Sequence, residues 1–72
     1  MVSNVKSGLS PETSSKVIDA LGGTAEVSRL CSVSTAAVSQ WRKKGMTRAF
    51  ALYLRERFKN LPIMKTDEVL SL

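Results

Sequence analysis

Residues 24–45, TAEVSRLCSVSTAAVSQWRKKG, contain two short helical patterns separated by a three-residue turn. Thr24 is a favoured N-cap residue, and the pattern that it opens predicts a helix over about residues 24–31. Ser34 is placed to cap the second pattern, which predicts a helix over about residues 35–44 that a glycine ends. The sequence therefore predicts two helices that meet across a tight turn.

Apolar side chains in this segment are spaced so that both helices and the turn can share one small core. They are Val27, Cys31, Val33, Val38 and Trp41. If Val38 and Trp41 face inward, the step of about 100° per residue sends a mostly polar set to the opposite side of the second helix. That set is Ala36, Ser39, Gln40 and Lys43. Small residues at the start of this helix would let it approach the floor of a DNA major groove.

Further helices are predicted on both sides of this pair. The tripeptide Ser10-Pro11-Glu12 is typical of a helix start, with Ser14 and Ser15 as alternative caps, and a glycine pair ends the helix. Thr47 can cap a helix over about residues 48–59. We therefore expect an all-α fold, a compact four- to five-helix bundle that contains the helix-turn-helix, with the domain spanning residues 11–62.

The two ends of the chain carry weaker patterns. Residues 1–10 are polar and small, and they are predicted to form a flexible arm. Residues 63–72 mix apolar, charged and small polar side chains without a clear period. An irregular tail, a short helix and an edge strand all remain possible there. The apolar surface over residues 48–59 is wider than a single core contact needs. That helix and the tail are therefore candidate dimer contacts, unless both complete the core of the monomer.

Composition excludes several functional classes. A chain of 72 residues has a small core and little room for an enzyme pocket, so neither catalysis nor a small-molecule ligand is expected. One cysteine and no histidine exclude an intramolecular disulfide and a Cys/His zinc site, and no metal or cofactor is expected. No apolar stretch approaches the roughly 18 residues that span a bilayer, and the first residues lack a signal-peptide pattern. We therefore expect a cytoplasmic protein that does not enter a membrane.

Positive charge is concentrated in one part of the chain. The net charge is +5, and residues 42–59 contain seven basic residues against one acidic residue. Such a cluster attracts polyanions, among which DNA, RNA and an anionic membrane surface all qualify. The plain alternative is a solvated surface without a partner.

The segment Ala36-Ala37-Val38-Ser39-Gln40-Trp41, followed by basic residues, resembles the recognition helix of the phage Cro proteins and related Cro/repressor-type regulators. The resemblance covers about residues 16–45. Two positions depart from the family pattern, with Ser28 in place of the usual alanine and Ser32 in place of the usual turn glycine. A serine in the left-handed conformation at the second position would cost roughly 1 kcal/mol relative to glycine.

The resemblance implies a set of DNA contacts. The residues expected at the bases are Thr35, Ala36, Ser39, Gln40 and Lys43. The residues expected at the DNA backbone are Thr24, Ser34, Arg42, Lys44 and Arg48. Among the first set, glutamine can pair with an adenine edge, a contact worth about 1–3 kcal/mol of discrimination. Trp41 and Cys31, by contrast, are expected to be core residues, since neither has the surroundings of a stacking platform or a reactive site.

The function that these features predict is sequence-specific binding of double-stranded DNA by a transcriptional regulator. A Cro-like repressor, acting as a homodimer on a pseudo-palindromic operator with half-sites about 34 Å apart, is the form expected first. An activator or an antitoxin-type DNA-binding partner remains open. From other classes, so do a basic protein-interaction module and an RNA-binding protein.

Overall fold

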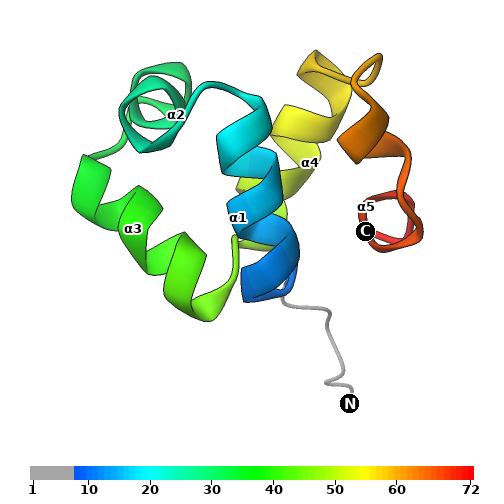
Figure 1. Ribbon diagram of the computed structural model, residues 1–72, viewed down its shortest axis with the longest axis horizontal. Helices are drawn as coiled ribbons and strands as arrows, with labels where there is room; N and C mark the ends of the chain where they lie inside the picture. The colour runs from blue at the N-terminus through cyan, green and yellow to red at the C-terminus, as the bar shows by residue number, and fades with distance from the viewer. Residues whose placement is uncertain (1–7) are drawn as a thin grey trace.

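Five α-helices and one 3-10 helix make up residues 8–72, the part of the chain that this computed structural model describes (Figure 1). They are α1 (Pro11–Ala20), α2 (Thr24–Cys31), α3 (Thr35–Lys44), α4 (Arg48–Arg57), the 3-10 helix η1 (Pro62–Lys65) and α5 (Asp67–Leu70). The described residues contain no strand and only one isolated bridge, between Gly8 and Thr47. The expected all-α fold class is confirmed.

The starts of α1 and α3 follow from local capping chemistry. Ser10, of the three serines considered, caps α1, because its side chain accepts a hydrogen bond from the Thr13 amide at 3.2 Å. Ser34 does the same for α3, accepting from the Ala37 amide at 3.1 Å. The bounds predicted for α2 and α3 are both confirmed. The fourth helix was predicted to residue 59 and ends two residues earlier, where the chain turns at Phe58.

The turn between α2 and α3 depends on Ser32. This serine has φ 57° and ψ 42°, and it is the only residue other than glycine with a positive φ in the described part of the chain. The left-handed conformation turns the chain back, so that the Val33 amide donates to the Ser28 carbonyl at 3.0 Å. Ser32 thus adopts the left-handed conformation that glycine adopts more easily, and it supplies the geometry that glycine would otherwise give.

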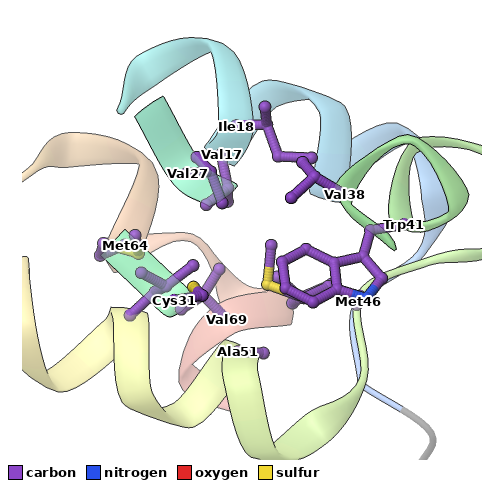
Figure 2. Packing of buried hydrophobic residues seen from close by; sticks show 12 residues of the cluster. Val17, Ile18, Val27, Cys31, Val38, Trp41, Met46, Ala51, Met64 and Val69 are labelled. Carbon is purple, nitrogen blue, oxygen red and sulfur yellow. The ribbon is translucent and has the colours of Figure 1, made fainter. Parts of the chain in front are cut away.

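The core holds the side chains that the helical spacing assigned to it. Val27 and Val38 are fully buried, Trp41 is 6% exposed, and Val33 packs against the cluster from the turn. Figure 2 shows Val27, Val38 and Trp41 converging with buried side chains of other helices. The Trp41 ring centroid lies 5.0 Å from that of Phe50 on α4. The buried hydrophobic cluster consists of Leu9, Val17, Ile18, Val27, Cys31, Val38, Trp41, Met46, Ala51, Leu54, Met64 and Val69.

The N-terminal arm, expected over residues 1–10, does not include residues 8–10. Leu9 is 4% exposed, and its amide donates to the Met46 carbonyl at 3.1 Å. Gly45 permits this approach, since a Cβ on it would collide with the Leu9 carbonyl oxygen. The burial of one leucine thus ties this segment to the α3–α4 connection. Residues 1–7 lie outside the described residues, and the prediction stays open there.

The tail forms short helices that complete the core. Met64 of η1 is 2% exposed, and Val69 of α5 is fully buried, so the domain boundary predicted at residue 62 falls too early. The edge-strand alternative is wrong, and the short-helix alternative is right. The Glu68 carboxylate accepts hydrogen bonds from the Ser10 amide and from the Thr13 hydroxyl, which holds α5 against the start of α1.

Candidate nucleic-acid interface

The outer face of α3 is formed by the five residues predicted to meet the bases. Thr35, Ala36, Ser39, Gln40 and Lys43 are all exposed. The reason is the helical period, because Val38 and Trp41 turn inward and Ala36, Ser39, Gln40 and Lys43 lie on the other side of the helix, while Thr35 is exposed at the first position of α3. Packing against α1 and α2 fixes α3 from behind (Figure 1). The five exposed residues of α3, four of them polar, are called the α3 face.

Two lysines lie at the C-terminal end of the α3 face, Lys43 within it and Lys44 beside it. Lys43 and Lys44 are exposed in the last turn of α3. Cations also suit this end of the helix dipole, which is a reason for their presence that does not involve a ligand. At the opposite end, Ser34 is exposed, and its hydroxyl already accepts the Ala37 amide. Its remaining hydroxyl proton can still be donated to an oxygen acceptor.

Thr24 and Arg42, both predicted at the DNA backbone, are joined to each other. The Arg42 Nε donates to the Thr24 Oγ1 at 3.1 Å, and a terminal guanidinium nitrogen of Arg42 lies 2.8 Å from the Asp19 carboxylate. Arg42 thus connects α3 with the first residue of α2 and the last turn of α1. The pairing with Asp19 was not foreseen, since the two residues are 23 positions apart and no local pattern links them.

The start of α2 keeps its first amides without a side-chain cap. The prediction of Thr24 as the N-cap is wrong, because Thr24 is the first helical residue and Gly23 is the N-cap. Gly23 has no side chain to accept a hydrogen bond from these amides. Amides at such an end, together with the positive end of the helix dipole, favour an anion. The sequence predicts a DNA phosphate at this end of α2, next to Thr24. In the structure Thr24 is half-buried and hydrogen-bonded to Arg42.

Arg48, the remaining backbone candidate, is exposed at the first position of α4. Its guanidinium donates to the Leu72 carbonyl at 2.9 Å. The structure therefore joins Arg48 to the C-terminal residue, whereas the other candidates lie on α3 or at the ends of α2 and α3.

Away from the α3 face, an open apolar pocket of about 310 Å³ lies between α2 and α4. It is lined by Leu30, Cys31, Ser32, Ala49, Phe50 and Tyr53. Burial raises the pKa of the Cys31 thiol, which keeps it protonated and poorly nucleophilic. Tyr53 is 44% exposed at the rim. This pocket therefore offers apolar contact area without reactive chemistry.

Two further properties concern residues 8–72 as a whole. No group of three or more His, Cys, Asp or Glu side chains in this range could hold a metal ion. Within the same range, none of the helices combines the length and the apolar character needed to cross a membrane.

No protein-family model, curated protein or solved structure matches the chain. Its function is therefore inferred from its own residues and their geometry.

Proposed function

We propose that the chain is a DNA-binding protein of the helix-turn-helix class, in which α3 enters the major groove of double-stranded DNA. The observation that carries this proposal is the division of α3 into a buried side, Val38 and Trp41, and an exposed polar side with Gln40 at its centre. A helix that packs against the protein on one side and presents polar side chains on the other can enter a major groove.

Charge supports the same partner. The chain carries a net charge of +5, and the exposed Lys43 lies within the α3 face while the exposed Lys44 borders it. Neutralising phosphates releases counterions, which supplies most of the sequence-independent affinity for DNA. Serine, threonine, glutamine and lysine side chains on the face have the donors and acceptors that base edges require. The face thus combines backbone attraction with groups able to read sequence.

Within that class, we propose a transcriptional regulator of the Cro type, a repressor that occupies an operator and excludes polymerase. The support is the resemblance of residues 36–41 to a Cro recognition helix. Such a regulator acts where bacterial DNA is, in the cytoplasm. Gene activation and an antitoxin role use the same DNA contact. A reporter gene under the selected operator separates activation from repression by the direction of the change, and an antitoxin role would require in addition a partner protein that binds the chain.

A second copy of the chain on the same operator is part of this proposal. The two regions predicted to make a dimer contact each leave one large apolar side chain exposed, Tyr53 on α4 at 44% and Leu70 on α5 at 59%. Tyr53→Lys and Leu70→Lys should each be tested for loss of cooperative binding to a palindromic site. If neither weakens cooperativity, these two regions do not form the dimer contact.

The test of DNA binding begins with selection of preferred sites from randomised duplexes. Gln40→Ala should then weaken binding to the selected site by roughly 1–3 kcal/mol while hardly changing affinity for random DNA. Lys44→Gln is the matched control, because a lost phosphate contact should weaken both by a similar factor. Absence of measurable binding to any duplex at low salt would reject DNA as the partner and favour an acidic protein. Preference for single-stranded RNA would reject it equally.

A further inference from the structure

The Arg42 guanidinium is the least exposed of the cationic groups in the last turn of α3. Its side chain is 29% exposed, whereas Lys43 and Lys44 are both exposed residues. Two of its nitrogens, Nε and one terminal nitrogen, already donate to Thr24 and Asp19. They belong to the same side of the planar guanidinium, so one of its two bidentate edges is occupied within the chain.

The ion pair also weakens the electrostatic reason for Arg42 to meet a phosphate. Asp19 lies 2.8 Å from the guanidinium and offsets part of its charge, so a phosphate at Arg42 would have to compete with this carboxylate. The Asp19 carboxylate, 70% exposed, would in addition repel any phosphate that approached Arg42. Arg42 therefore differs from Lys44, which lies beside the same face and forms no ion pair with any of the described residues.

We propose that Asp19 restrains DNA binding by holding the Arg42 guanidinium within the chain, so that Arg42 positions α3 against α1 and α2 in place of binding a phosphate. This inference rests on the proposed DNA-binding function and reassigns one of its expected backbone contacts. An ion pair with so exposed a partner contributes little to folding stability. Asp19 also occupies the last turn of α1, where a negative charge opposes the helix dipole. Its effect should consequently be found in DNA binding.

The test measures how the affinity for a random duplex depends on salt. Asp19→Asn releases Arg42 and should steepen the slope of log K against log salt by about 0.9, the value for one phosphate. Between 50 and 200 mM salt, the variant should then lose affinity by a factor about threefold larger than the wild-type protein does. Glu56→Gln is the matched control, because it removes one negative charge from another exposed ion pair, with Arg55 on α4, and should leave the slope near that of the wild type.

A second comparison isolates the positioning role of Arg42. Arg42→Gln should leave the salt slope unchanged while weakening binding to the selected site, whereas Lys44→Gln should lower the slope by about 0.9. In the Arg42→Gln background, Asp19→Asn should have no effect on the slope. Thermal unfolding of each variant checks that the fold is intact.

The outcomes separate this inference from the proposed function. If the wild-type protein binds duplex DNA with a normal salt slope but Asp19→Asn changes that slope no more than Glu56→Gln does, DNA binding stands and the restraint is refuted. The restraint is also refuted if Asp19→Asn changes the salt slope by the same amount in the wild-type protein and in the Arg42→Gln variant. If the wild-type protein binds no duplex at all, the proposed function falls and the restraint falls with it.

Discussion

Ser14 is a fully buried polar residue on α1, and its replacement by alanine should destabilise the fold markedly. Its Oγ accepts a hydrogen bond from the Met46 amide at 2.7 Å and lies 3.5 Å from the Leu9 carbonyl, to which it donates. Ser14→Ala leaves the Met46 amide in the interior without this acceptor. An unsatisfied buried donor costs roughly 1–3 kcal/mol, and the better helix propensity of alanine returns at most about 0.7 kcal/mol. The expected loss is therefore about 1–2 kcal/mol.

The assay is urea unfolding followed through the fluorescence of Trp41, the sole tryptophan, which is buried beside Phe50. The midpoint should fall with an unchanged m-value, and the melting temperature should drop by roughly 4–8 °C per kcal/mol. Ser15→Ala is the control, because it makes the same chemical change one position along α1 at a half-buried site and should be neutral or slightly stabilising. A Ser14→Ala variant within about 0.5 kcal/mol of the wild-type protein would refute the reasoning.

Three further predictions concern the core and the turn. Val38→Ala should lower the free energy of unfolding by roughly 1.5–3 kcal/mol in the same assay, because Val38 is fully buried; an unchanged midpoint would contradict its inward placement. Ser32→Gly should raise stability by about 0.5–1 kcal/mol, since φ 57° strains serine but not glycine, and Ser32→Ala should show no such gain. Because burial raises the pKa of the Cys31 thiol above its ordinary 9.0, the folded state favours the protonated thiol, so stability should fall as pH rises beyond 9. That pH dependence should be shallower in Cys31→Ala, and equal slopes would exclude this cause.

Local signals were enough to predict the helix-turn-helix. Each of its features is encoded within a few residues: Ser34 caps α3, Ser32 turns left-handed, and the spacing of Val38 and Trp41 selects the buried side. These are matters of backbone conformation and helical period, which neighbouring residues determine. The exposed placement of Gln40 follows from the same period and was correctly predicted.

Contacts between residues far apart in the chain could not be predicted from capping residues and helical period. Ser14 was considered only as a possible cap, because nothing near it in the chain indicates that Met46, 32 positions away, needs an acceptor. The secondary structure of residues 63–72 could not be predicted for the same reason. Val69 becomes a core residue only when α5 packs on a surface made by other helices. The Asp19–Arg42 pair is a third case, in which a cation that looked available for DNA already has a partner.

The way in which the core is assembled explains how so small a domain can keep the α3 face exposed. Val38 and Trp41 are the buried residues of α3, so the helix depends on its neighbours for stability, and helices of this length are marginal on their own. Leu9, Met64 and Val69, from the two ends of the described chain, enclose the remaining core. Because these three residues supply buried apolar surface, the core does not need apolar side chains from the α3 face. The side chains of that face can therefore be those that a ligand requires. Substitutions such as Gln40→Ala should therefore leave the scaffold intact, so that any loss of DNA affinity measured for that variant would be attributable to a lost contact.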